Sequence, residues 1–144
     1  MLNDCYLRVK LIGDVKAPTR GTGQSAGLDF YAPEDITILP GKDLLTPLNV
    51  RVELPIGYAM VFKEKSGIST KFKISLGACV VDSDYRGIVH AHLFNHGQYV
   101  AVFHKGDKVI QAIVIPVWLG DPEIVEEVDM NTERKEGGFG STGK

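Results

Sequence analysis

The sequence predicts an all-β sandwich or barrel formed by a single domain. Apolar and polar residues alternate in short runs, and turn-forming residues interrupt these runs at short intervals. No amphipathic helix longer than two or three turns can be drawn on the chain. The 144 residues, 44% of them hydrophobic and 24% charged, suffice for one globular domain with its own core.

Three alternating runs predict strands that each bury one face. Their apolar positions are Leu7, Val9 and Leu11, then Val50, Val52 and Leu54, then Val89, Ala91 and Leu93. Turns are expected between the runs, because glycine, proline and asparagine cluster there. These turn segments are LPGK (39–42), LPIG (54–57), NHG (95–97) and KGD (105–107).

Three further segments complete the prediction. A dense apolar run over 109–118 predicts a strand covered on both faces, with Pro116 at an edge or a bulge because proline donates no hydrogen bond. The segment SGISTKF, 66–72, predicts one short helix capped by Ser66. After Asp121 the composition becomes acidic and then glycine-rich, which predicts an extended segment followed by a flexible arm.

Composition and charge restrict the classes of function. A formal net charge of −2 disfavours a binder of polymeric nucleic acid, which needs a basic face. No apolar stretch approaches the roughly eighteen residues of a membrane span, and no signal-peptide pattern opens the chain. Cys5 and Cys79 are expected to be free thiols in a reducing compartment. We therefore expect a soluble intracellular protein in the cytoplasm, or in the host cytoplasm if it is viral or phage-encoded.

Histidines and carboxylates are the candidates for chemistry. The four histidines could form a metal cluster, but no acidic residues accompany them at metal-site spacing, and exposed strand and turn positions are the more common outcome. The segment GACVVDSDYRG, 77–87, predicts a β-hairpin with two aspartates at its mouth. Taken alone, this hairpin fits capping aspartates better than it fits catalysis.

Five segments in order change that interpretation. They are AGLDFYAPED (26–35), EKSGIS (64–69), GACVVDSDYRG (77–87), GDKVIQAIVIP (106–116) and RKEGGFGSTG (134–143). Together they resemble the five sequence blocks of the trimeric deoxyuridine triphosphatase (dUTPase) family, over nearly the whole chain.

The resemblance implies a jelly-roll-like β-barrel protomer over 1–130 and a glycine-rich arm over 131–144. The arm would close the active site of a neighbouring subunit in a homotrimer. The implied reaction is hydrolysis of dUTP to dUMP and pyrophosphate with Mg²⁺ on the phosphates. Such an enzyme limits uracil incorporation into DNA and supplies dUMP for dTMP synthesis. Its partners would be the nucleotide and its own copies, with no polymeric nucleic acid and no membrane.

The resemblance also assigns roles in the hairpin. Asp82 would activate the attacking water, whereas Asp84 would tie the hairpin together. Tyr85 would pack on the sugar and crowd a ribose 2′-hydroxyl. The main chain would recognise uracil through Gly77, Ala78, Cys79 and Val81. Because Cys79 stands where the family commonly has glycine, its side chain must point away from the base.

The remaining assignments concern the phosphates and the arm. Lys65 stands where the family usually has arginine. Its ammonium group would bind phosphate as a single charge, without the two parallel N–H bonds of a guanidinium group. Asp29 would support the metal indirectly, through its bound waters. Phe139 would stack on the uracil. The triphosphate would bind Lys65, Ser66, Gly67, Gln111, Arg134, Gly140, Ser141 and Thr142.

Two other functions stay open at this point. A bifunctional dCTP deaminase and dUTPase would belong to the same structural superfamily, and release of ammonia from dCTP would identify it. A dUTPase-like regulatory protein, switched by the nucleotide, would use the arm to contact a partner protein.

Overall fold

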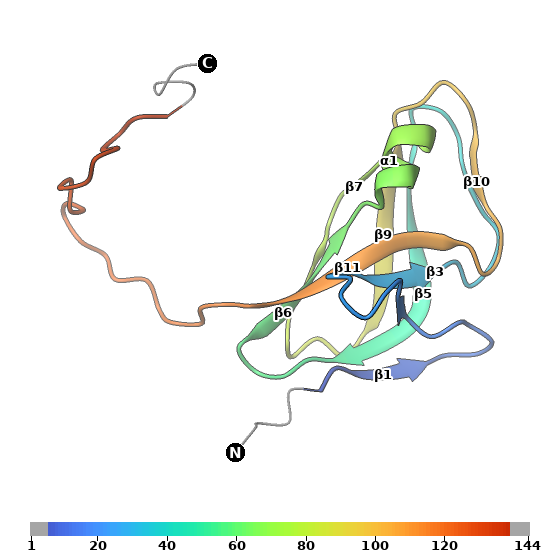
Figure 1. Cartoon of the computed structure of the whole chain (residues 1–144), viewed down its shortest axis with the longest axis horizontal. Coiled ribbons are helices and arrows are strands. Elements are labelled where there is room, and N and C mark those ends of the chain that lie inside the picture. The colour runs from blue at the N-terminus through green and yellow to red at the C-terminus, as the bar shows by residue number, and fades with distance from the viewer. Residues whose placement is uncertain (1–5, 139–144) are drawn as a thin grey trace.

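The computed structural model describes residues 6–138 and confirms an all-β fold with one short helix (Figure 1). The helix, α1, spans Ser66–Phe72. The strands are β1 (Arg8–Leu11), β2 (Thr19–Arg20), β3 (Leu28–Tyr31), β4 (Ile36–Ile38), β5 (Asp43–Glu53), β6 (Tyr58–Lys63), β7 (Ile74–Leu76), β8 (Val80–Val81), β9 (Ile88–Asn95), β10 (Ala101–Phe103) and β11 (Lys108–Pro116).

Two main sheets enclose the core of a jelly-roll-like β-barrel. One sheet has the strand order β1-β5-β9-β7 and the other has the order β2-β3-β11-β6-β8. Strands β10 and β4 form a small third sheet. Every pairing is antiparallel, and many neighbours in a sheet are distant in sequence, so the chain repeatedly crosses between the sheets.

The core follows the alternation in the sequence. Val50 and Val52 of β5 are 2% and 3% exposed, and the predicted positions of β9 are buried in the same way. From the other sheet, Phe30 and Phe62 meet edge to face with their ring centroids 5.4 Å apart. Burial of each such side chain contributes about 1.5–3 kcal/mol to the stability of the fold. The packed interior of the barrel therefore holds the walls of the site in place.

The first predicted strand is less buried than its alternation suggests. Val9 and Leu11 are 38% and 39% exposed. The physical reason is position, because β1 lies at the end of its sheet and pairs with β5 alone among the described strands. Alternation therefore identified the strand correctly but not the burial of its apolar face.

Strand β11 confirms the expectation for Pro116. Strand β3 pairs with β11 as far as Ala112, whereas β6 pairs with it through Pro116. At its last residue β11 therefore has one neighbour, and the missing N–H group of proline costs no ladder hydrogen bond.

The helix lies where it was predicted, but its predicted cap is wrong. Lys65 occupies the N-cap position with extended dihedral angles, and no side chain caps the helix. Ser66 is already the first helical residue. A capping side chain must come from the residue before the first turn, so the hydroxyl of Ser66 stands one position too late.

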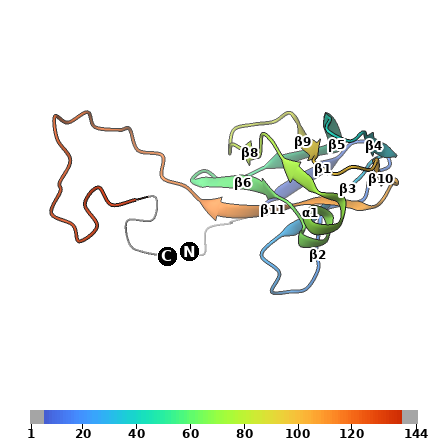
Figure 2. The same ribbon diagram turned by 90° about the horizontal axis from the view of Figure 1, so that it is seen from above.

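The chain leaves the barrel after β11. The N–H of Val117 still donates to the carbonyl of Gly57, at 2.8 Å, but residues 118–138 form no helix or strand. Figures 1 and 2 show this segment running away from the barrel. No helix among the described residues is long and apolar enough to cross a membrane.

Candidate active site

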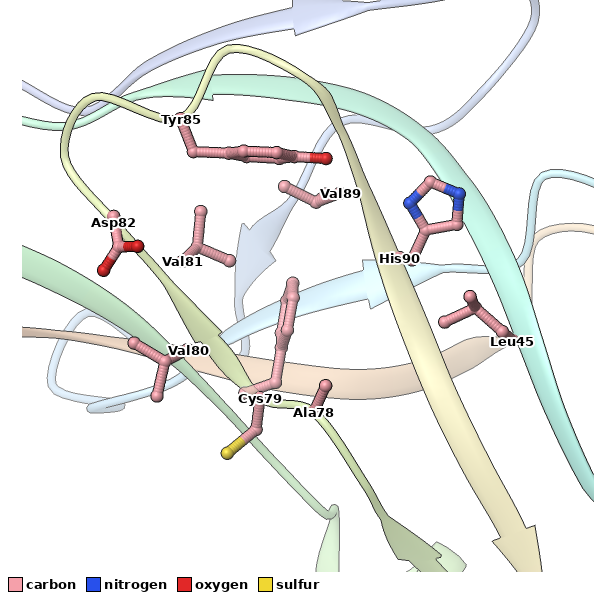
Figure 3. A pocket seen from close by; sticks show the side chains of 10 residues that line it. Leu45, Ala78, Cys79, Val80, Val81, Asp82, Tyr85, Val89 and His90 are labelled. Carbon is pink, nitrogen blue, oxygen red and sulfur yellow. The ribbon is translucent and has the colours of Figure 1, made fainter.

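A pocket of about 220 Å³ opens between the β8 hairpin and strands β5 and β9 (Figure 3). It is smaller than the roughly 300–1,000 Å³ typical of sites for drug-sized ligands, so it suits a single ring whose substituents extend outside. The lining is mostly apolar and comprises Leu45, Phe62, Ala78, Cys79, Val80, Val81, Asp82, Tyr85, Val89 and His90.

Asp82 stands at the mouth of the hairpin. Strand β8 pairs with β6 through Met60 and Val81, and the buried side chain of Val81 anchors the hairpin in the core. The next residue, Asp82, is exposed, and its carbonyl accepts a hydrogen bond from the N–H of Tyr85 in a tight turn. Within residues 6–138 no group bonds to the Asp82 carboxylate. A rigidly mounted and unpaired carboxylate can orient a water molecule and accept its proton.

Tyr85 forms one wall of the pocket (Figure 3). Its hydroxyl donates to the carbonyl of Ile88 at 2.9 Å, which folds the ring back over the hairpin. Gly87 lies under this ring, because a Cβ atom there would come within 2.3 Å of the Tyr85 hydroxyl oxygen. Glycine at position 87 is therefore required for this position of the tyrosine ring.

The expected structural role of Asp84 is wrong. Its carboxylate forms no hydrogen bond or ion pair with another residue of the described chain. The hairpin is tied instead by Tyr85 and by Arg86, whose guanidinium donates to the carbonyl of Ser83 at 2.7 Å. Arginine can reach back over a turn to main-chain oxygens, whereas the short side chain of Asp84 is exposed to solvent.

The segment that leads into β8 carries Cys79. The carbonyl of Cys79 accepts a hydrogen bond from the N–H of Phe62, at 2.7 Å. In Figure 3 the sulfur atom of Cys79 points away from Tyr85 and His90. Its side chain packs partly against the core, so this departure from glycine leaves the ring-sized space open. Ala78 and Val81 line the same pocket.

A second cluster of predicted residues surrounds a buried carboxylate. Asp29 on β3 is 3% exposed, and its two oxygens bond to different lysines. Lys65 pairs with one oxygen, and Lys108 pairs with the other at 2.8 Å. Burial raises the pKa of the Asp29 carboxyl, but the hydrogen bonds from Lys108 and Lys65 together lower it further, so its pKa lies below the ordinary value.

This ion-paired carboxylate predicts a pH-dependent contribution to stability. A lowered pKa stabilises the fold at high pH, and the effect is lost as pH falls below the ordinary value of 3.8. Asp29→Asn is expected to lower the free energy of unfolding at pH 7 by roughly 1.5–3 kcal/mol, the usual contribution of a hydrogen bond to a charged group. Urea unfolding at pH 7 and pH 3 would measure the difference in free energy of unfolding between the wild type and Asp29→Asn. This difference should be smaller at pH 3 than at pH 7. A difference that is equal at both pH values would contradict this role of the carboxylate.

Gln111 lies beside this cluster on β11. It is paired in register with Asp29 on one side and with Lys63 on the other, so the three side chains share one face of the sheet. The Gln111 amide nitrogen donates to the carbonyl of Glu64 at 2.8 Å. Its amide oxygen fills the space above Gly27, where a Cβ atom would come within 2.3 Å. The amide is therefore held in place next to the cationic side chains.

The structure brings the predicted residues together in two groups rather than one. Five predicted residues line the pocket, namely Ala78, Cys79, Val81, Asp82 and Tyr85, whereas Gly77 precedes them and does not line it. Lys65, Gln111 and Asp29 form a second group, the charged row. Ser66 and Gly67 begin α1 directly after Lys65. Arg134 contacts neither group, because its Nε atom donates to the carbonyl of Gly137 within the extended segment. The predicted residues Phe139, Gly140, Ser141 and Thr142 lie outside the described residues.

Several residues of the site were missed in the sequence. Phe62 and Val89 have the sequence pattern of ordinary core residues. Leu45 and His90 lie on the outer face of the β5–β9 pair, and nothing in the sequence distinguishes them from ordinary surface residues. Lys108 was also missed as a partner of Asp29. Its one signal was its place in the block GDKVIQAIVIP. The missed residues are Leu45, Phe62, Val89, His90 and Lys108.

Residues 6–138 contain no group of three or more histidine, cysteine, aspartate or glutamate side chains arranged to hold a metal ion. The described histidines also have separate partners. His92 lies 2.9 Å from Asp43, and His96 lies 2.7 Å from Ser75.

The protein is thus a jelly-roll-like β-barrel with a ring-sized pocket, an unpaired carboxylate at its mouth, and two lysines paired with a buried aspartate. The dUTPase family model matches residues 13–143. A rat deoxyuridine 5′-triphosphate nucleotidohydrolase is 41% identical over 143 residues, covering 99% of this chain and 69% of the relative. A relative of the same name from Debaryomyces hansenii is 43% identical over 129 residues, covering 88% and 80%.

A solved structure shows the same fold. The dUTPase of Staphylococcus bacteriophage 80alpha matches with a TM-score of 0.90 at 24% identity, covering 96% of this chain and 99% of the phage chain. The protein belongs to the dUTPase family. The resemblance found in the sequence is thereby confirmed.

Proposed function

We propose that the protein is a dUTP diphosphatase that hydrolyses dUTP to dUMP and pyrophosphate. The observation that carries this proposal is the unpaired Asp82 carboxylate at the mouth of a ring-sized pocket. The names of the similar rat and yeast proteins support the same substrate. The base would enter the pocket and leave the triphosphate outside, toward the charged row.

Asp82 would act as general base. A water molecule bound to its carboxylate attacks the α-phosphorus, and the carboxylate takes up the proton. The bond between the α-phosphorus and the bridging oxygen breaks, and pyrophosphate leaves with that oxygen. The rigid pairing of β8 with β6 holds the carboxylate in position, so little ordering is needed during the reaction.

Base and sugar specificity would come from the hairpin. The main chain of Gly77, Ala78, Cys79 and Val81 would hydrogen-bond the uracil edge and leave no room for a methyl group at C5. Tyr85 would cover the sugar, because its ring is held against Gly87 and the carbonyl of Ile88. A 2′-hydroxyl would meet this ring.

The charged row would bind the triphosphate. Lys65, Ser66, Gly67 and Gln111 would contact its oxygens, and Asp29 would hold waters of a Mg²⁺ ion carried by the phosphates. The donor set fits this indirect role, because a single buried carboxylate lies next to the side chains of Lys65 and Lys108. Mg²⁺ would neutralise charge on the triphosphate. A triphosphate that draws Lys65 away would free one oxygen of Asp29.

The site would be completed by another subunit. The barrel domain would span 1–130, and the arm over 131–144 would close a neighbour's site in a homotrimer. The extended course of residues 118–138 away from their own barrel supports this arrangement (Figure 2). Phe139 would stack on the base. Glycine at 140 would let main-chain N–H groups approach the phosphates, which Arg134, Ser141 and Thr142 would also bind.

In the cell, this reaction would limit the incorporation of uracil into DNA and supply dUMP for dTMP synthesis. We place the enzyme in the cytoplasm, because its two cysteines favour a reducing compartment. Its partners would be the nucleotide and two further copies of the chain, without polymeric nucleic acid or membrane.

Pyrophosphate release from dUTP, dCTP, dTTP and UTP, with and without Mg²⁺, tests the proposal. We expect turnover of dUTP alone, stimulated by Mg²⁺. Ammonia released from dCTP would favour a bifunctional deaminase instead. Binding of dUTP without release of pyrophosphate would favour a regulatory protein switched by the nucleotide.

The packing of Tyr85 on Gly87 predicts the discrimination against ribonucleotides. Gly87→Ala places a methyl group within 2.3 Å of the tyrosine hydroxyl, so the ring must move. The ratio of kcat/KM for dUTP to that for UTP is expected to fall about tenfold, the low end of what steric exclusion of a small group provides. Gly23→Ala is a matched control, because its Cβ atom would meet nothing within 4 Å. An unchanged ratio in Gly87→Ala would contradict this role of the ring.

A further inference from the structure

The base-binding segment of the hairpin is fixed at two points. At its far end, the carbonyl of Cys79 accepts from the N–H of Phe62. At its near end, the N–H of Gly77 donates to the carbonyl of His92 at 2.9 Å. Ala78, between these two points, lines the pocket. The position of this segment is therefore set by what holds Cys79 and Gly77.

The side chain of His92 occupies the place where a side chain at position 77 would be. A Cβ atom on Gly77 would lie 2.2 Å from Nδ1 of His92 and 2.9 Å from its Cγ and Cε1 atoms. The imidazole therefore packs directly on the α-carbon of Gly77. No displacement of Gly77 toward the outer face of the sheet is possible while the ring stays where it is.

Two neighbours on the outer face hold the imidazole. Its Nε2 atom lies 2.9 Å from the carboxylate of Asp43, on β5, and its ring contacts that of Phe94 with centroids 4.5 Å apart. The hydrogen bond from His92 keeps the pKa of Asp43 below its ordinary value, so the carboxylate accepts from the imidazole as an ion. His92 is thus supported from the strand next to its own.

The same strand pair also lines the pocket. Leu45 of β5 is the register partner of His92 and contributes to the pocket wall together with His90. The His92 side chain therefore lies beside Leu45 on the outer face and packs against Gly77. These contacts connect residues that are far apart in sequence to the place where the base would bind.

We propose that His92, held by Asp43, is a positioning residue that fixes the base-binding main chain and so determines discrimination between uracil and thymine. This inference rests on the proposed function and goes beyond it, because neither residue touches the substrate. Removing the ring would leave space next to the α-carbon of Gly77, and the segment could then shift and admit a methyl group at C5.

The test compares kcat/KM for dUTP and for dTTP in the full-length protein. His92→Ala is expected to lower the ratio of dUTP to dTTP about tenfold, within the range that exclusion of one methyl group provides. The loss should appear mainly as a higher KM for dUTP, because Asp82 follows Val81, which β6 and the core hold independently of His92. His104→Ala is the matched control, since it removes an exposed imidazole that pairs with Asp35 and has no contact with Gly77, Asp43 or Phe94. Its ratio should equal that of the wild type.

A double variant measures the contact itself. Gly77→Ala alone drives a methyl group into the imidazole and should impair dUTP turnover severely. In Gly77→Ala combined with His92→Ala the clash is gone, so turnover should recover toward the level of His92→Ala. If the loss of dUTP turnover in the double variant equals the product of the losses in Gly77→Ala and His92→Ala, the inference is overturned.

Asp43→Ala keeps the test decisive if His92→Ala does not fold. Asp43 is exposed, so its loss should leave the thermal unfolding midpoint nearly unchanged while lowering the substrate ratio in the same direction. The inference is overturned if folded His92→Ala has the wild-type ratio of kcat/KM for dUTP to that for dTTP. If only Asp43→Ala folds, a wild-type ratio in that variant overturns it. Absence of dUTP turnover in the wild type would instead overturn the proposed function.

Discussion

Asp82→Asn is expected to lower kcat for dUTP by about 10²–10⁴-fold, the usual contribution of a general base. The amide has nearly the size and shape of the carboxylate but cannot accept the proton of the attacking water. Because the Asp82 side chain bonds to no other described residue, its replacement should not disturb the fold. Single-turnover release of pyrophosphate would measure the loss, and the thermal unfolding midpoint would show that the barrel is intact.

Asp84→Asn is the matched control. Asp84 is exposed on the same hairpin and also lacks a partner within residues 6–138, so its replacement should change kcat by no more than about twofold. Equal losses in the two variants would indicate that hairpin charge, rather than a positioned base, is required. Full activity in Asp82→Asn would contradict the assignment of the base.

Deletion of residues 134–144 is expected to leave a folded trimer whose kcat/KM for dUTP is lower by on the order of 100-fold, the scale of loss when substrate positioning is degraded. The deletion removes the proposed ring contact of Phe139 and the phosphate contacts of the arm. The barrel should keep its stability, since the deleted residues that the structure describes, 134–138, belong to no strand and the core lies between the two sheets.

Phe139→Ala separates stacking from closure. This variant retains the glycines and the hydroxyl residues of the arm, so it should raise KM for dUTP with a smaller effect on kcat than the deletion. Base–aromatic stacking is worth about 1–3 kcal/mol, which corresponds to roughly 5–150-fold in affinity. Unchanged kinetics in the deletion variant would remove the arm from the mechanism.

The strands of the barrel could be predicted because burial has a local signature. Alternation identified the buried residues Val50, Val52 and Leu93 correctly, since a strand with one face on the core must repeat every second residue. Where a strand lies at the edge of its sheet, the same signature overstates burial, as at Val9. Alternation reports the period of a strand and contains no information on which strands lie beside it.

The site could be predicted only in part. Five ordered blocks identified the family and the hairpin with Asp82, because those residues adjoin one another in sequence. The contact of Gly77 with His92 and the pairing of Asp29 with Lys108 depend on strand register, which joins residues far apart in the chain. The cap at Ser66 failed for a different reason, because a shift of one residue in a helix start changes which side chain can reach the first turn.

Mixing two inactive variants tests most directly the claim that Asp82 of one subunit works with the arm of another. The Asp82→Asn chain and the chain lacking residues 134–144 would be unfolded together in equal amounts and refolded into mixed trimers. If each site takes its carboxylate and its arm from different chains, about one quarter of the sites regain both, and dUTP hydrolysis should return to about one quarter of the wild-type rate. A mixture that stays as inactive as its two components, although mixed trimers have formed, would contradict the shared site.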